Sequence, residues 1–104
     1  DLKKIFIDPG IGFGKRLKDN YEILQRIEEL KFLGYPVLIG LSRKSLIGKL
    51  LDIPVEERLT GTIATNAVSL LKGVNVIRVH DVKEAIQVKK IIEAIENPES
   101  INNV

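Results

Sequence analysis

The sequence predicts an α/β fold built on a parallel sheet, and two observations lead to that prediction. Short apolar runs rich in β-branched residues alternate three times with longer segments whose apolar residues recur at helical spacing. A strand, a crossover helix and a further strand imply parallel pairing, and near-continuous apolar strands indicate that both faces of the sheet are buried. The chain is therefore expected to form three consecutive strand–helix units.

The first unit is expected to contain a strand over residues 4–8, a glycine-rich loop and a helix. Asp19 and Glu22 fit a capping box at the start of that helix. Its predicted apolar face consists of Leu24, Ile27, Leu30 and Leu33. Gly34 follows this face and is expected to end the helix in the C′ position.

The second unit is expected to begin with a strand over residues 37–41. A short helical piece near residues 46–51 comes next, and Pro54 should separate it from a longer helix that Gly73 ends. The predicted shared face of the longer helix consists of Leu59, Ile63, Asn66 or Ala67, and Leu70. We assign no functional role to its Thr and Asn residues.

The third unit is expected to place a strand over residues 76–80, followed by a helix that ends before Pro98. Asp81 and Glu84 fit a second capping box. The predicted apolar positions of the helix are Ile86, Ile92 and Ile95. Its charged residues are expected to form a solvated face.

Composition limits the classes of function. The chain has 104 residues, of which 44% are hydrophobic and 29% charged, as in an ordinary globular domain. A net charge of +2 and dispersed lysines give no indication of a nucleic-acid surface. No apolar run approaches the roughly 18 residues of a membrane span and no secretory leader is evident, so a cytoplasmic location is expected. Without Cys and with a single His, disulfides and structural zinc are excluded.

Two architectures contain such units, a doubly wound sheet and an incomplete (β/α)₈ barrel, since a whole barrel needs about 250 residues. Both bind ligands at the carboxyl ends of the strands. The residues at those ends are Asp8, the loop over residues 42–45, Arg78 and His80. We therefore expect any functional site to be built from these positions.

Alternation along the third strand places Val76, Arg78 and His80 on one face and Ile77 and Val79 on the other. A buried Arg78 requires a negative partner, because an unpaired buried charge costs several kcal/mol. That partner is either a bound anion or a carboxylate elsewhere in the fold. A lone histidine such as His80 is usually structural.

The glycine loop after the first strand does not match a nucleotide-binding motif. The pattern Gly10-x-Gly12-x-Gly14 lacks the spacing of G-x-G-x-x-G, and Gly14-Lys15 is not followed by Ser or Thr. Asp8, which precedes the glycines, has two interpretations: it begins a turn, or it accepts N–H donors from a heterocycle at the ligand end of the strand.

The second loop also allows two interpretations. Ser45 stands at the start of the short helical piece, where it is either an ordinary N-cap or part of a site for a carboxylate or phosphate. Lys44 beside it has the same double interpretation.

Four motifs together resemble one family. DPGIGFGK at residues 8–15, GLSRKS at 40–45, ERLTGTIATNA at 57–67 and RVHDV at 78–82 are similar, in order and spacing, to the C-terminal part of dihydropteroate synthase. The resemblance implies a (β/α)₈ TIM barrel, with these three units equivalent to strands six to eight and residues 1–104 forming one incomplete pterin-binding domain.

The resemblance also implies an activity. The family is a transferase of folate biosynthesis that condenses 6-hydroxymethyl-7,8-dihydropterin pyrophosphate with p-aminobenzoate, giving 7,8-dihydropteroate and pyrophosphate, and it is a sulfonamide target. Lys44, Arg78 and His80 are the catalytic residues it implies. Asp8 and Lys44 would contact the pterin, Arg78 the pterin and phosphate, and His80 the pyrophosphate.

The second substrate, p-aminobenzoate, would meet Phe13 in the glycine loop and Ser45. The family's Mg²⁺ ligand would lie in a missing N-terminal part, so no metal ligand is expected in this chain. The exposed strand edges and apolar inner face of an incomplete barrel are expected to drive self-association as a homodimer. The expected partners are the small-molecule substrates, with no nucleic acid and no membrane. The isolated chain is expected to be inactive. Two alternatives stay open, a non-catalytic folding or assembly fragment and a pterin-binding methyltransferase domain.

Overall fold

The computed structural model describes residues 7–11, 16–41 and 44–101. Its α-helices are α1 (Leu17–Gln25), α2 (Ile27–Lys31), α3 (Ser45–Leu51), α4 (Leu59–Leu71) and α5 (Val82–Glu96). Short 3₁₀ helices span Val55–Glu57 and Pro98–Ser100, and the strands are β1 (Leu38–Ile39) and β2 (Val76–Ile77). Helices therefore dominate the described part of the chain, around a small sheet.

The strands pair in parallel, as the sequence predicts. In the two-stranded sheet, Leu38 lies opposite Val76 and Ile39 opposite Ile77. Ile7 forms a further parallel bridge with Val37. The three strand segments therefore lie side by side in chain order, which confirms an α/β arrangement. The assigned strands are shorter than predicted, and residues 4–6 of the first predicted strand lie outside the described residues.

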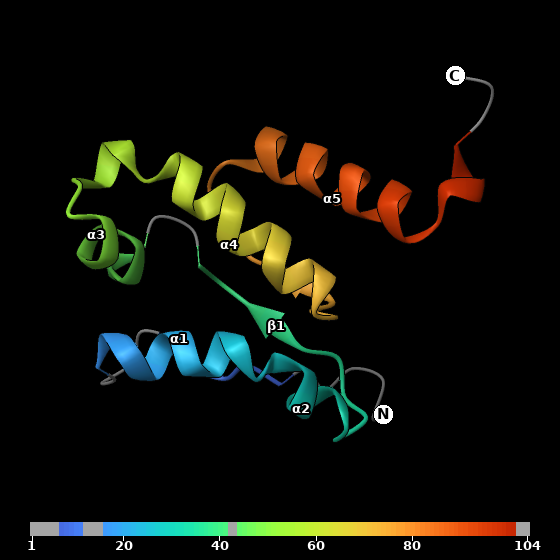
Figure 1. The fold of residues 1–104 in the computed structure, drawn as a ribbon, viewed down its shortest axis with the longest axis horizontal. Coiled ribbons are helices and arrows are strands. Elements are labelled where there is room, and N and C mark those ends of the chain that lie inside the picture. Colours follow the sequence, from blue (N-terminus) through green and yellow to red (C-terminus); the bar gives the residue numbers. More distant parts are fainter. Residues whose placement is uncertain (1–6, 12–15, 42–43, 102–104) are drawn as a thin grey trace.

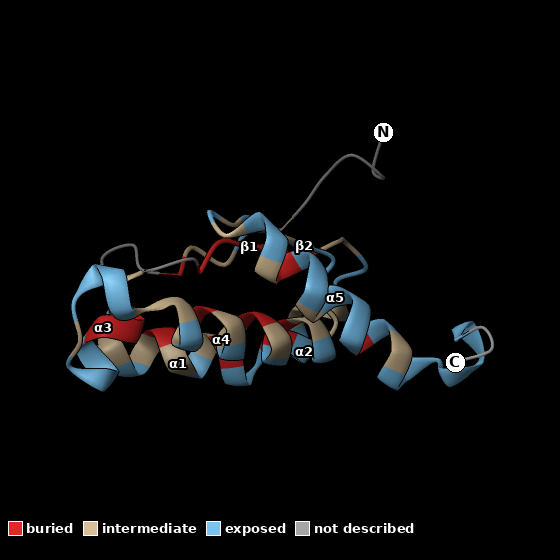
Figure 2. Ribbon diagram, turned by 90° about the horizontal axis from the view of Figure 1, so that it is seen from above, coloured by how far each residue is buried: buried red, intermediate tan, exposed pale blue. Residues whose placement is uncertain are grey.

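The molecule has one layer of strands and one of helices. Figure 2 shows the strands above α1 and α4, with buried residues between the two layers. In the view of Figure 1, which looks down on the two layers, β1 is seen between the pair α1 and α2 and the pair α4 and α5. The shortest extent, 21 Å, fits two layers packed about 10 Å apart. The helices thus cover one side of the sheet.

The hydrophobic core lies between the first two strand segments and the first three helices. The buried cluster consists of Ile11, Leu24, Ile27, Val37, Ile39, Leu41, Leu46, Ile47 and Val74. β2 is different, because Val76, Arg78 and His80 are exposed. The expectation that both faces of every strand are buried is therefore wrong for β2 in this chain.

The first predicted helix is divided in two. Arg26, with φ −106° and ψ 20°, leaves the helical conformation between α1 and α2. The N-cap of α1 is Arg16, and Asp19, three residues later, accepts a hydrogen bond from the Arg16 backbone N–H at 3.2 Å. The predicted capping box that begins at Asp19 is therefore wrong. Leu33, predicted on the buried face, follows the end of α2 and is 60% exposed. Gly34, with φ +84°, lies in the turn beyond it.

The buried face of α4 is polar. Asn66, one of the two alternatives on the predicted face, is buried together with Thr62 and Ser69. The apolar residues of that face, Leu59, Ile63, Ala67 and Leu70, are only half-buried. The hydroxyl of Ser69 donates to the backbone oxygen of Thr65 at 2.7 Å, so part of this polarity is satisfied within the helix. The Asn66 Oδ1 has no hydrogen-bond partner among the described residues. Gly73, with φ +102°, follows the C-cap as predicted.

The helix α5 starts at the predicted place but buries a different set of residues. Asp81 is its N-cap residue and Glu84 lies in the first turn, although Asp81 makes no side-chain capping hydrogen bond. Ile92 is buried as predicted, whereas Ile86 and Ile95 are exposed. One predicted apolar position of three therefore faces the core.

Hydrogen bonds from two side chains, Tyr21 and Lys72, hold α3 and the end of α4 against the first two helices. The Tyr21 hydroxyl of α1 donates to the Leu46 backbone oxygen of α3 at 3.0 Å. The Lys72 ammonium, after α4, donates to the Glu28 carboxylate at 2.9 Å and to the Gln25 backbone oxygen at 3.1 Å. The start of α3, which follows Lys44, is thereby tied to α1.

Candidate functional site

Three of the predicted site residues line one small cavity at the carboxyl ends of the strands. The cavity has a volume of about 120 Å³ and is lined by Gly40, Lys44, Arg78, Val79 and His80. Gly40 and Lys44 follow β1, and the other three follow β2. The structure thus brings together the three residues that the resemblance implies as catalytic.

The strand register explains why Arg78 reaches this cavity. The Arg78 backbone N–H donates to the Ile39 oxygen at 2.9 Å, which continues the parallel pairing past β2. Arg78 and His80 are exposed whereas Ile77 and Val79 are half-buried, which confirms the predicted alternation. Arg78 therefore lies on the face of the sheet away from the helices.

Gly40 lies directly under the Arg78 guanidinium. A Cβ atom added to Gly40 would come within 2.8 Å of Arg78 Nη2 and 3.1 Å of Nε. We predicted no role for Gly40 from the sequence. The available signal was a glycine inside a predicted strand, which often marks the close approach of another group.

Lys44 connects the two loops of the site. It is the N-cap residue of α3, and its ammonium donates to the Ile11 backbone oxygen at 2.8 Å. Burial lowers the pKa of Lys44, the positive charge of Arg78 lowers it further, and the carboxylate of Asp8 partly opposes both effects. An anion in the cavity would favour the charged form of Lys44 and raise that pKa again.

Asp8 acts as a turn residue. Its Oδ1 accepts a hydrogen bond from the Gly10 backbone N–H at 2.9 Å, and Gly10 has φ +69°. This confirms the turn interpretation. A carboxylate has two acceptor oxygens, so the turn and a ligand contact are compatible, and the pterin contact stays a prediction.

The two predicted p-aminobenzoate residues have different outcomes. Ser45 is exposed and is the first residue of α3, after the N-cap Lys44, so the interpretation of Ser45 as the N-cap is wrong. Phe13 lies outside the described residues.

The cavity has the wrong chemistry for Mg²⁺. Magnesium is bound by carboxylate and other oxygen ligands, whereas the side chains that line the cavity are cationic, imidazole or apolar. Residues 7–11, 16–41 and 44–101 hold no group of three or more His, Asp or Glu that could bind a metal. The same residues contain no helix long and apolar enough to cross a membrane.

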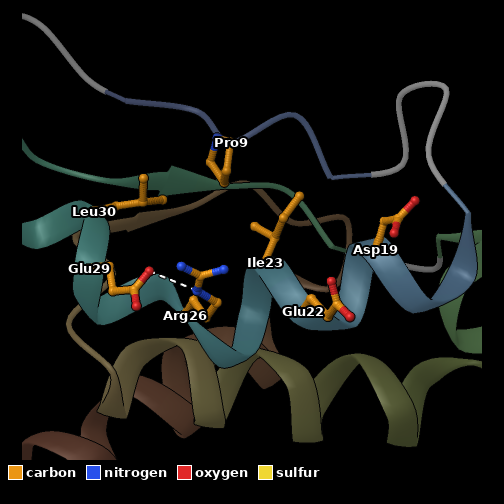
Figure 3. Close-up of a pocket in the computed structure, with 7 residues that line it drawn as sticks. All are labelled: Pro9, Asp19, Glu22, Ile23, Arg26, Glu29 and Leu30. Carbon is orange, nitrogen blue, oxygen red and sulfur yellow. Dashed lines mark hydrogen bonds and ion pairs between the residues drawn. The ribbon is translucent and has the colours of Figure 1, made fainter.

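A larger hollow lies beside the first strand segment, as Figure 3 shows. It has a volume of about 550 Å³ and lies between Pro9 and the helices α1 and α2. Its charged lining residues are Asp19, Glu22, Arg26 and Glu29. Each of these carboxylates has a cationic partner: Glu29 pairs with Arg26 at 2.8 Å, Asp19 with Arg16 at 3.1 Å and Glu22 with Lys18 at 3.7 Å. This hollow contains none of the predicted site residues.

Comparisons with known sequences identify relatives over most of the chain. The family model described as "Pterin binding enzyme" matches residues 1–80. Dihydropteroate synthase from Escherichia coli (strain K12) is 45% identical over 92 residues, 88% of this chain and 33% of the relative. The Bacillus subtilis (strain 168) enzyme is 44% identical over 103 residues, 99% of this chain and 36% of the relative. The chain spans about a third of the length of these relatives.

Solved structures give the same result. Yersinia pestis dihydropteroate synthase with a sulfonamide drug aligns over 92% of this chain and 35% of that chain, with a TM-score of 0.89 and 42% identity. The Coxiella burnetii enzyme with pteroic acid aligns over 91% of this chain and 35% of that one, with a TM-score of 0.87 and 40% identity. Family match, sequence identity and fold agree, and the chain belongs to the family of pterin-binding enzymes.

Proposed function

We propose that this chain is the C-terminal part of a dihydropteroate synthase that binds the pyrophosphate of its pterin substrate between Lys44, Arg78 and His80. The observation that carries the proposal is the cavity in which these three side chains meet without a lining carboxylate. Two cations and an imidazole that can carry a third charge suit a polyanion, because charge-assisted hydrogen bonds to phosphate oxygens are strong. The expectation that a buried Arg78 requires a negative partner is wrong, because Arg78 is exposed; the proposal rests on the shared cavity instead.

The proposed reaction is the one that the resemblance to dihydropteroate synthase implies. The bond between the pterin methylene carbon and the pyrophosphate oxygen breaks, and its electron pair leaves with pyrophosphate. The amine nitrogen of p-aminobenzoate then bonds to the methylene carbon and loses a proton. Lys44, Arg78 and His80 stabilise the charge that develops on the leaving group, which is where preorganised donors contribute most.

The remaining site residues would bind the two organic parts. Asp8 would accept N–H groups of the pterin ring, and Lys44, whose pKa Asp8 influences, would also contact the pterin. The exposed Ser45 hydroxyl would meet the carboxylate of p-aminobenzoate, with Phe13 nearby. Sulfonamide and pteroic acid in the related structures support a site for both substrates.

We also infer that residues 1–104 form strands six to eight of a (β/α)₈ barrel, as one incomplete domain. The parallel order of the strand segments, the helices on one side of the sheet and the coverage of about a third of the relatives support this. In this proposal the magnesium ligand belongs to the rest of the barrel.

A hybrid enzyme tests the function. This chain replaces the matching third of Escherichia coli dihydropteroate synthase, and the purified hybrid is assayed for dihydropteroate formation from both substrates. We expect product, because the chain would supply the pyrophosphate site and the Escherichia coli part the rest. A folded hybrid that forms no dihydropteroate but binds methyl-tetrahydrofolate would favour the methyltransferase alternative.

A second candidate, a self-associating assembly fragment, is favoured by exposed apolar side chains. Val82, Ile86, Ile91 and Ile95 of α5 are each more than half exposed, and Val76 on β2 is 36% exposed. Apolar surface of this kind favours association with a second copy. Sedimentation of the purified chain at micromolar concentration is expected to show dimers or larger species. A monodisperse folded monomer would argue against this candidate.

A further inference from the structure

We propose that Gly40 is a positioning residue for Arg78: the absence of a side chain on Gly40 lets the guanidinium lie against the backbone just after β1, at the anion cavity. The inference deepens the proposed function and rests on it for the identity of the anion. The contact between Gly40 and Arg78 follows from the strand pairing, so it can be tested separately from the identity of the anion.

The close approach is specific to the Arg78 side chain. The three atoms nearest to a Cβ added at Gly40 are Nη2, Nε and Cζ of Arg78, at 2.8, 3.1 and 3.2 Å. Cβ atoms essentially never approach other heavy atoms to less than 3.0 Å, so a methyl group here and the guanidinium cannot both keep their places. The atoms that must yield belong to the end of a flexible side chain, so an alanine is expected to move Arg78 and leave the fold intact.

The backbone does not require a glycine at this position. Among the described residues, the glycines with positive φ are Gly10, Gly34 and Gly73. Gly40 has no such conformation, and any residue can adopt its backbone. The parallel register instead sets Gly40 beside Arg78, since Ile39 lies opposite Ile77. Space for the guanidinium is the remaining physical reason for a glycine.

The pKa of Lys44 depends on the position of the Arg78 guanidinium. Burial lowers the pKa of Lys44, and the charge of Arg78 lowers it further against the opposing carboxylate of Asp8. Lys44, Arg78 and His80 line the same cavity. If Arg78 is displaced, its charge no longer acts on Lys44, and the pKa of Lys44 should rise towards its ordinary value although Lys44 itself is not substituted.

The test is Gly40→Ala in the 104-residue chain. The pKa of Lys44 is measured by NMR on ¹³C-methylated lysines, with Lys44→Arg to assign the signal, and inorganic pyrophosphate binding is measured by calorimetry. We expect the pKa of Lys44 to rise and pyrophosphate affinity to fall about tenfold, roughly the effect of one lost hydrogen bond between charged groups. In an Arg78→Ala background, Gly40→Ala should change neither quantity further.

Gly34→Ala is the matched control. The added methyl group at Gly34 meets no atom within 4 Å, but φ +84° strains the backbone, so this variant loses stability without touching Arg78. It should leave the pKa of Lys44 unchanged. The proposal is overturned if Gly40→Ala leaves that pKa unchanged, acts equally in the Arg78→Ala background, or unfolds the chain in either background.

The two proposals fail in different ways. A chain that binds no pyrophosphate, but in which Gly40→Ala still raises the pKa of Lys44 only when Arg78 is present, would contradict the proposed anion site and support the positioning role. A chain that binds pyrophosphate equally well with and without Gly40→Ala, and in which the pKa of Lys44 does not change, would support the anion site and contradict the positioning role of Gly40.

Discussion

Arg78→Ala in the hybrid enzyme is expected to lower kcat/KM for the pterin pyrophosphate by at least about 100-fold, the usual effect of removing one preorganised donor from a developing negative charge. Arg78 carries the guanidinium that lies against Gly40 and lines the cavity with Lys44 and His80. Steady-state rates of dihydropteroate formation with the pterin substrate varied give the value.

Arg16→Ala is the control for this variant. Its guanidinium pairs with the Asp19 carboxylate at 3.1 Å, but the side chain is 82% exposed and lies at the start of α1. Exposed ion pairs of this kind contribute little to stability, and no predicted substrate contact involves this residue. Arg16→Ala should therefore keep nearly full activity. Equal rates for the two variants would contradict a role for Arg78 in binding the leaving group.

The 104-residue chain alone is expected to form no detectable dihydropteroate. Holding two reactants in the correct geometry supplies roughly 7 to 11 kcal/mol of a barrier, and a chain that spans a third of its relatives offers only part of each substrate's site. The purified chain is assayed with both substrates and Mg²⁺ at the protein concentration used for the hybrid.

The hybrid serves as the positive control for that assay, because it has the same residues over the shared third. Product formed by the isolated chain, and abolished by Arg78→Ala, would contradict the account. It would mean that Lys44, Arg78 and His80 can orient both substrates without the rest of a barrel.

The sequence predicted the parts of the fold and site that depend on local pattern. Alternation along residues 76–80 correctly separated Arg78 and His80 from Ile77 and Val79. The rule that ligands meet the carboxyl ends of parallel strands correctly directed attention to Lys44 and Arg78, which the structure places around one cavity. The first prediction needs only the alternation of side chains along a strand, and the second needs only the parallel direction of neighbouring strands.

Predictions that depended on packing were less successful. Periodicity selects the more apolar face of a helix, but α4 buries Thr62 and Ser69 beside Asn66, and the Ser69 hydroxyl is satisfied by the Thr65 backbone oxygen. The exposed face of β2 could not be predicted either, because an apolar run does not reveal whether a neighbour covers it.

The contact between Gly40 and Arg78 shows a third limit. The two residues are 38 positions apart in the sequence, and only the register of Ile39 with Ile77 makes them neighbours. A sequence pattern can place a glycine in a strand, but the side chain that lies on it depends on the strand pairing.

The most direct test of the account is the rate of dihydropteroate formation by the hybrid, measured with and without the combined substitutions Lys44→Ala, Arg78→Ala and His80→Ala. The unsubstituted hybrid should turn over both substrates, and the triple variant should fall to the rate of the Escherichia coli part alone while keeping its fold by circular dichroism. A folded triple variant as active as the unsubstituted hybrid would contradict the claim that this cavity binds the leaving pyrophosphate.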